Sequence, residues 1–330
     1  MSVKSNNVQI FITKNKTILI IYAITIIIFT IFSTLQKDFL TPYGLTSIFN
    51  QVIVLCIIVF GQTLVIISAG IDLSVGAIVG LTNSLAATVM FPLYQYVGNE
   101  FYCIIITIII ALLVGSFAGL INGVIITYVR LQPIIVTLAT SSVILGIALY
   151  IRPSPGGKVL PIFTNLFTGR LLNYIPISFI ILLVFIFIWI LFRHLRLSQS
   201  IYAIGSSEFS SYTSGINVSR TKILVYVLSG LFSACGGLVL TSQTASGDPV
   251  GSGLFTLNSI AAVVLGGAAL TGGKGSYLGS VAGAITLSLI LGILVFLGIS
   301  SFLSSAVQGI ILILVLSTGL IKSKKREYLL

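Results

Sequence analysis

Long apolar runs separated by short polar connections make up most of this chain. Runs close to 20 residues long, the length of a helix that crosses a bilayer core, lie at about 17–35, 46–69, 73–92, 101–128, 133–151, 175–192, 222–241, 255–270, 277–297 and 303–321. Their apolar residues are continuous, whereas apolar and polar residues alternate along the strands of a membrane β-barrel. The pattern predicts an all-α polytopic membrane protein with about ten transmembrane helices.

Composition strengthens this prediction. Of the 330 residues, 57% are hydrophobic and 7% are charged, whereas about a quarter of the residues in soluble domains are charged. The mean hydropathy is +1.17. The three cysteines, Cys56, Cys103 and Cys235, lie inside apolar runs, which favours inert buried thiols over a disulfide framework or a metal site. We therefore expect a multi-pass protein of the cell membrane.

The basic residues gather on one side of this topology. With the N-terminus inside, the 17 lysines and arginines all fall on the inner side except Lys37, Arg152, Lys158 and Arg170. Positive charge concentrates in cytoplasmic connections, so both termini are predicted to be cytoplasmic. The same distribution accounts for the net charge of +11 without nucleic acid. The basic residues within 322–326 suit an anchor on anionic membrane lipid.

The chain divides into three parts on this reading. Residues 1–16 form a cytoplasmic N-terminal segment, residues 17–321 form a single transmembrane domain, and residues 322–330 form a basic cytoplasmic tail. Two connections inside the domain are long. Residues 152–174 are predicted to be a structured external loop, and residues 193–220 are the longest cytoplasmic connection.

A single acid interrupts the apolar stretch 63–82. A charge beside hydrocarbon costs several kcal/mol unless it is solvated, capped or paired. We expect one helix to end at Ala69–Gly70 and Asp72 to be the N-cap of the next, where its carboxylate can accept free backbone N–H groups. Gly76 and Gly80, four residues apart, would give that helix a face on which another backbone can approach closely.

The spacing around Asp72 has an echo later in the chain. Gly70-x-Asp72-x-Ser74 resembles Gly272-x-Lys274-x-Ser276. Glycine-interrupted segments at matching places indicate a transport path, although 32 glycines also allow a chance match. We expect Asp72 and Lys274 to lie near one another as an ion pair. The predicted gate or helix break comprises Gly70, Asp72, Gly76, Gly272, Gly273 and Lys274.

Catalytic patterns are missing from the sequence. The only histidine, His194, lies between arginines at the end of a predicted helix, and the six acids form no closely spaced pair. No GxxxxGK[ST] phosphate loop occurs, so the chain does not bind ATP by that route. We expect a chain that is not an enzyme and holds no cofactor or metal. Its few acids also argue against a coupling-ion site, so the energy source should lie on another subunit.

Amides on the predicted helices are candidates for lining a solute path. Each could equally serve as a helix–helix hydrogen bond. The candidates are Asn50, Gln62, Asn83, Asn122 and Asn258, with Gln51, Gln243 and Gln308 as further polar positions.

The cytoplasmic connection contains a stretch too apolar for a solvated linker. We expect a short amphipathic helix over about 207–214 that ends at Gly215 and docks in a groove of a cytoplasmic partner. Gly205 and Gly215 would allow turns, Phe209 would fill the groove, and Glu208 would pair with a basic residue of the partner. The predicted contact residues are Ala203, Gly205, Glu208, Phe209, Gly215 and Ile216.

Four stretches carry a family resemblance. They are GQTLVIISAGIDLSVGAIVGLT at 61–82, GLINGVIITYVRLQPIIVTLAT at 119–140, YAIGSSEFSSYTSGINV at 202–218 and IAAVVLGGAALTGGKGSYLGSVAGA at 260–284. The chain resembles the permease subunits of ATP-binding-cassette importers of the ribose-type sugar class, which also includes autoinducer-2 permeases. The resemblance spans about residues 45–316.

The resemblance implies a translocation subunit for a small sugar or sugar-like solute. Such permeases work as a homodimer or with a related permease, together with cytoplasmic ATPase subunits that bind ATP and Mg²⁺ and an external substrate-binding protein. The loop that matches 202–218 is the one expected to touch the ATPase. An ion-coupled secondary transporter and a membrane scaffold protein remain alternatives, and the sequence does not name the solute.

The predicted topology can be checked by cysteine labelling from outside the cell. A cysteine at Ser154 should react with an impermeant reagent, because residues 152–174 are predicted to be external. A cysteine at Ser323 should be protected, because the tail is predicted to be cytoplasmic. The reverse pattern of labelling would rule out this orientation.

Overall fold

Helices account for nearly all of the ordered backbone in the computed structural model, which describes residues 2–300, 303, 304, 306–310, 313 and 314. Its strands form one short antiparallel hairpin, β1 (Arg170–Leu171) with β2 (Ile175–Pro176). The helices are α1 (Ser2–Leu35), α2 (Pro42–Ile67), α3 (Val75–Val97), α4 (Glu100–Val124) with the π-helical turn η1 (Ile125–Val129), α5 (Pro133–Ile151), α6 (Pro161–Thr168), α7 (Ile177–Phe192), α8 (Arg196–Ser206), α9 (Glu208–Thr213), α10 (Val218–Thr244), α11 (Leu254–Leu265) and α12 (Tyr277–Phe296).

The helix lengths confirm an all-helical polytopic membrane protein. Within the described residues seven helices are long and apolar enough to span a membrane, or eight if α7 and α8, bent by 77° at their junction, form one span. The remaining difference from about ten has two sources. The predicted helix 255–270 is the 12-residue α11, and most of 303–321, together with the tail 322–330, lies outside the described residues.

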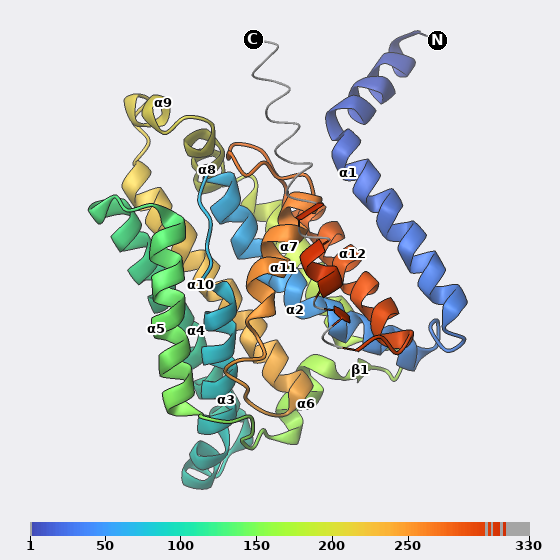
Figure 1. The fold of residues 1–330 in the computed structure, drawn as a ribbon, viewed down its shortest axis with the longest axis vertical. Helices are drawn as coiled ribbons and strands as arrows, with labels where there is room; N and C mark the ends of the chain where they lie inside the picture. Colours follow the sequence, from blue (N-terminus) through green and yellow to red (C-terminus); the bar gives the residue numbers. More distant parts are fainter. Residues whose placement is uncertain (1, 301–302, 305, 311–312, 315–330) are drawn as a thin grey trace.

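The two ends of the bundle carry different connections (Figure 1). One end, called here the α9 end, carries α8, α9 and the turn between α11 and α12. The opposite end, called the α6 end, carries α6 and the β hairpin. The long connections 193–220 and 152–174 therefore lie at opposite ends, as the predicted topology requires. The connection 152–174 is structured, because Phe163 on α6 is fully buried and Gly156 pairs with Gly247.

Helix α2 forms the centre of the bundle. In its most apolar window 89% of the residues are buried, so it carries apolar residues all round, as a helix with neighbours on every side does. Phe60 illustrates the packing: its ring lies 4.3 Å from that of Phe232 on α10 and 4.6 Å from that of Tyr277 on α12, between ring centroids. Trp189 on α7 closes the same cluster at 5.5 Å.

Glycines bring α4 and α10 into backbone contact. A Cβ on Gly119 would lie 2.1 Å from the carbonyl oxygen of Tyr226, and one on Gly230 would lie 2.1 Å from that of Gly115. Small residues at such crossings let membrane helices pack without intervening side chains. The position of α10, and with it of the polar residues described below, therefore depends on these glycines.

Two helices are followed by extended segments that run back along the bundle (Figure 1). After α2, residues 68–74 return toward the middle before α3 begins. After α10, residues 245–253 do the same from the α6 end before α11 begins. Helix α2 ends at Ile67, slightly before the expected Ala69–Gly70, and the Gly70 amide closes the end by donating to the Val65 carbonyl at 2.9 Å.

Substitution of Gly119 by alanine should destabilise the protein by about 1–3 kcal/mol, because the added methyl group overpacks the crossing of α4 and α10. Gly146 on α5 is the matched control, since a Cβ there meets no atom within 4 Å. Alanine at Gly146 should stabilise by about 0.5–1 kcal/mol through helix propensity. Thermal unfolding in detergent measures both, and equal transition temperatures for the two variants would contradict the packing argument.

Candidate functional site

The two extended segments meet inside the bundle. The Gly76 amide, in the first turn of α3, donates to Thr256 Oγ1 on α11 at 3.0 Å, and Ser252 Oγ donates to the Gly76 carbonyl at 2.9 Å. A Cβ on Gly80 would lie 2.5 Å from the carbonyl oxygen of Pro249. The close approach expected at Gly76 and Gly80 therefore occurs, and the approaching backbone is residues 249–253.

Asn83 fastens the second segment to α3. Its amide nitrogen donates to Thr241 Oγ1 at 2.9 Å and to the Ser246 carbonyl at 3.0 Å. Its amide oxygen accepts the Asp248 backbone N–H at 2.6 Å. Asn83 is 1% exposed, and its side chain satisfies backbone groups in the segment between α10 and α11.

Asp72 lies in the first segment and is fully buried. Its Oδ1 accepts the Ser74 amide at 2.9 Å and the Ser74 hydroxyl at 2.6 Å, while its Oδ2 is hydrogen-bonded to the Ser229 hydroxyl of α10 at 2.7 Å. The expected N-cap role was wrong by two residues. Helix α3 begins at Val75 with Ser74 as its N-cap, because the segment stays extended past Asp72 to reach α10.

A hydrogen-bonded chain runs from Asp72 through Ser74 to two further helices. Asn122 of α4 donates from Nδ2 to Ser74 Oγ at 2.8 Å, and Thr140 of α5 donates to Asn122 Oδ1 at 2.6 Å. Thr137 of α5 also accepts the Leu73 amide at 3.0 Å. This segment is therefore held by α4, α5 and α10 together.

The expected ion pair between Asp72 and Lys274 is not formed. Lys274 is exposed in the turn after α11, whereas both oxygens of Asp72 are hydrogen-bonded to hydroxyl and amide groups. The backbones of the two glycine turns do meet: the Gly273 amide donates to the Ile67 carbonyl at 2.8 Å. A Cβ on Gly272, which has φ +86, would lie 2.7 Å from the Ala69 Cβ. The similar spacing of the two glycine motifs therefore corresponds to two turns in backbone contact and not to an ion pair.

Helix α8 packs on these turns. A Cβ on Gly205 would lie 1.7 Å from the Ile67 carbonyl oxygen and 2.5 Å from the Gly273 nitrogen, and Tyr202 donates its hydroxyl to the Gly275 carbonyl at 2.7 Å. Gly205 was expected to let the chain turn; instead it lies inside α8 and is buried. It joins α8 to the end of α2 by direct backbone contact.

Helix α9 is the short helix expected over about 207–214. It spans Glu208–Thr213, with Ser207 as N-cap, and the chain leaves it through Gly215 at φ +82. Phe209 and Tyr212 are 78% and 73% exposed, and Ala203 and Ile216 are half-buried. Glu208 was expected to pair with a basic residue of the partner, but it already forms an ion pair within the chain, because Lys222 Nζ lies 2.6 Å from its Oε2. Within the described residues it is the only ion pair.

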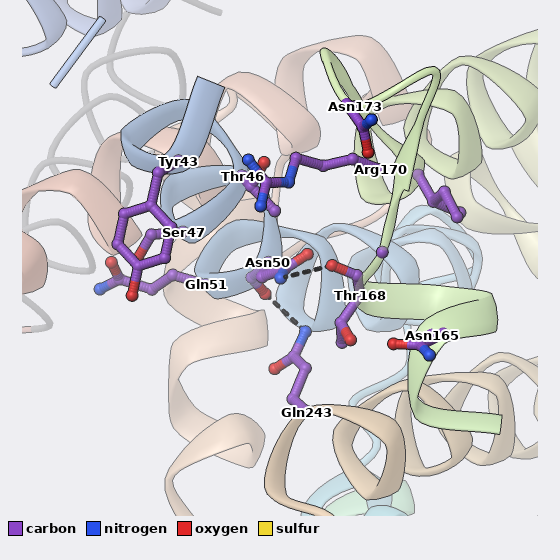
Figure 2. A pocket seen from close by; sticks show the side chains of 12 residues that line it. Tyr43, Thr46, Ser47, Asn50, Gln51, Asn165, Thr168, Arg170, Asn173 and Gln243 are labelled. Carbon is purple, nitrogen blue, oxygen red and sulfur yellow. Dashed lines mark hydrogen bonds between the residues drawn. The ribbon is translucent and has the colours of Figure 1, made fainter. Parts of the chain in front are cut away.

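A polar cavity of about 670 Å³ opens at the α6 end (Figure 2). Figure 2 shows side chains converging on it from the start of α2, the stretch from α6 to the β hairpin, and the end of α10. Asn50 is held in the wall of this cavity by two hydrogen bonds. Its side-chain Nδ2 donates to the Thr168 backbone carbonyl at 3.3 Å, and its backbone carbonyl accepts Gln243 Nε2 at 2.6 Å. The lining residues are Tyr43, Thr46, Ser47, Asn50, Gln51, Asn165, Thr168, Gly169, Arg170, Asn173, Ile177 and Gln243.

The structure separates the candidate path residues into different environments. Asn50 lines the cavity, whereas Asn83 and Asn122 bind neighbouring helices. Gln62 is fully buried and its amide makes no hydrogen bond within the described residues, and Asn258 is half-buried on α11. Sequence reasoning missed the cavity itself, because its walls come from three segments that lie far apart in the sequence.

Comparison with known proteins decides the family. Residues 44–316 match the family described as the permease component of the branched-chain amino acid transport system. The chain is 35% identical to the ribose import permease protein RbsC of Escherichia coli (strain K12) over 91% of this chain and 92% of the relative. This chain belongs to that permease family.

Two further relatives support the assignment. The D-allose transport system permease protein AlsC of Escherichia coli (strain K12) is 32% identical, covering 92% of this chain and 91% of its own length. The galactose/methyl galactoside import permease protein MglC of the same strain is 29% identical over 93% of this chain and 95% of its own length. No solved structure matches. The resemblance to ribose-type permeases is confirmed, and the chain is a multi-pass, non-catalytic permease subunit of a transport system.

Double-mutant cycles on the purified permease should distinguish the observed contacts from the expected ion pair. Asp72→Asn and Ser229→Ala should be non-additive in the free energy of unfolding, by about 0.5–3 kcal/mol, because their side chains share a hydrogen bond. Asp72→Asn and Lys274→Gln should add within about 0.5 kcal/mol, because no contact joins them. Non-additivity confined to the pair with Lys274 would contradict the geometry.

Proposed function

We propose that this permease is the membrane-spanning translocation subunit of an ATP-binding-cassette importer for a small carbohydrate. In such an importer, cytoplasmic ATPase subunits bind ATP and Mg²⁺, an external binding protein delivers the solute, and a second permease copy completes the path. The observation that carries the proposal is the match over nearly the whole chain to relatives named as ribose, galactose and allose permeases.

The chemistry of the polar cavity supports a carbohydrate. Amide side chains both donate and accept hydrogen bonds, as sugar hydroxyls do. Asn50, Gln51, Asn165, Asn173 and Gln243 place such amides around the cavity, beside the hydroxyl groups of Thr46 and Ser47. The cavity contains no acidic side chain, which suits a neutral polyhydroxyl solute better than a cation. We infer that it forms part of the solute entrance.

The α9 end supports docking of an ATPase. The chain has no phosphate loop, so force from ATP hydrolysis has to enter through a surface. Phe209 and Tyr212 project from α9 as exposed aromatic side chains, the residue type that dominates binding energy at interfaces. The pair Glu208–Lys222 ties α9 to the start of α10. At Gly205 the backbone of α8 contacts the end of α2 directly. A movement of α8 would therefore displace the end of α2 without an intervening side chain.

Two alternatives fit fewer observations. An ion-coupled transporter needs charged groups or broken helices that hold its ion at mid-membrane, whereas here the buried Asp72 and the crossing of the two breaks are engaged by hydrogen bonds from neighbouring helices. A scaffold protein has no need of a polar cavity. Co-purification of an ATPase from native membranes separates the importer from the scaffold.

Replacing Phe209 with Asp should abolish ATP-coupled uptake while the permease still inserts into the membrane. The substitution puts an unpaired charge into the proposed groove and removes an aromatic anchor, a loss of about 2 kcal/mol or more in binding. Phe101→Asp is the control, because Phe101 is 67% exposed at the opposite end of the bundle. Normal uptake by Phe209→Asp at normal expression would remove α9 from the coupling surface.

Reversing the charges of Lys158 and Arg170 should weaken docking of the binding protein more at low salt than at high salt. Both side chains are exposed at the α6 end, and complementary charges steer such encounters. Measurement of the binding protein's affinity for reconstituted permease across ionic strengths tests this. An affinity loss that does not change with salt would count against electrostatic docking there.

A further inference from the structure

Asp72 has no part in solute entry or ATPase docking as proposed above, yet it is fully buried between helices. An ionised carboxylate in such a place is costly unless a positive group or a strong set of donors offsets its desolvation. The surroundings of Asp72 therefore bear on whether it carries a charge at all.

The side chains around Asp72 are neutral. Its own hydrogen bonds come from Ser74 and Ser229, and the next polar groups are Asn122 and Thr137. The titratable group that faces this region is Tyr226 of α10, whose hydroxyl would lie 2.6 Å from a Cβ on Gly70. Asp72 forms no ion pair with any described residue.

The beginning of α3 does not supply the missing positive charge. A helix terminus stabilises an anion by directing its free amides at it. Here the Gly76 amide donates to Thr256 and the Leu73 amide donates to Thr137. The Ser74 amide alone reaches Asp72. All three hydrogen bonds of the carboxyl group are thus made with neutral groups.

The direction of the network leaves one oxygen able to hold a proton. Thr140 donates to Asn122, which donates to Ser74, and the Ser74 hydroxyl in turn donates to Asp72 Oδ1. Among the described residues, Oδ2 forms a hydrogen bond with Ser229 Oγ alone. A serine hydroxyl in a helix can instead donate to the carbonyl four residues before it, as Ser233 does to Ser229 at 2.8 Å. Ser229 can therefore accept from a protonated Oδ2.

Two buried polar groups on α2 and α10, the helices on either side of this region, make no hydrogen bond with the described residues. They are the hydroxyl of Tyr226, which is 2% exposed, and the amide of Gln62, which is fully buried. Tyr226 points at the segment that contains Asp72, and Gln62 follows Gly61, which packs on the Ser229 backbone. A charged carboxylate attracts nearby donors, yet the Tyr226 hydroxyl makes no hydrogen bond with Asp72.

We propose that Asp72 is a proton-binding site. In this conformation the carboxyl group carries a proton on Oδ2 and donates it to Ser229 Oγ. When residues 68–74 separate from α10 during the transport cycle, the O–H bond breaks, the proton passes to water, and water molecules solvate the resulting carboxylate. The second step rests on the proposed importer cycle, whereas the first concerns the resting permease alone. Alkaline pH then favours the separated arrangement.

Infrared spectroscopy of the full-length permease in lipid nanodiscs tests the first step without any transport assay. A C=O stretching band of a protonated carboxyl group should be present at neutral pH and lost in Asp72→Asn. Asp248→Asn is the matched control, because Asp248 is a half-buried acid at the other break whose Oδ1 accepts the Val250 and Gly251 amides. That variant should keep the band.

A second route covers the case in which Asp72→Asn does not fold. Aspartates occur at residues 38, 72 and 248, so ¹³C-aspartate labelling of Asp38→Asn/Asp248→Asn protein should shift the band by labelling Asp72 alone. No protonated band at neutral pH, or a band that survives in folded Asp72→Asn, would overturn the proton site.

The second step is tested with the complete importer in D₂O. The Asp72 band should shift to its deuterated position faster during ATP turnover than at rest, because turnover exposes the group to water. Equal exchange rates in an importer that takes up solute would overturn the link to the cycle. Absence of uptake with the band still present would instead count against the proposed function.

Discussion

Backbone groups freed by a broken helix have to find partners inside the protein wherever water is excluded. In this permease the helical conformation is interrupted between α2 and α3 and again between α10 and α11. Many of the backbone groups freed at one interruption are hydrogen-bonded by residues of the other. Gly76 and Thr256 bond across the crossing, Ser252 returns a bond to Gly76, and Asn83 holds the second segment. The packing of glycines at this crossing and between α4 and α10 follows from that requirement, because a side chain at those positions would separate the backbones.

The same crossing joins the two ends of the molecule. The turn after α2 lies against Gly205 of α8 and Gly273 of the turn before α12, so a force on the exposed helix α9 acts close to the break that holds Asp72. At the other end, α2 begins beside the polar cavity that contains Asn50. The central helix thus connects the proposed ATPase surface with the proposed solute entrance, which is the arrangement that a translocation subunit requires.

Patterns local in sequence predicted much of this. Continuous apolar runs identified the helices, and the apolar residues beside Glu208 predicted α9 because a helix of one or two turns depends on neighbouring residues. The close packing at Gly76 and Gly80 was also readable from their spacing. The partner of Asp72 was not, because Ser229 is 157 residues away and a serine in an apolar helix looks the same whether it binds its own backbone or an acid. The cavity escaped prediction for a similar reason, since Asn50, Arg170 and Gln243 meet only in the fold.

The energy source for uptake tests the account most directly. Proteoliposomes that contain this permease with its ATPase subunits would be given the binding protein, loaded with its labelled carbohydrate, on the outside. Uptake would be measured with and without internal ATP, and with an ionophore that dissipates ion gradients. Uptake should require ATP and be unchanged by the ionophore. Uptake that proceeds without ATP and stops when the ionophore is added would contradict the proposed function.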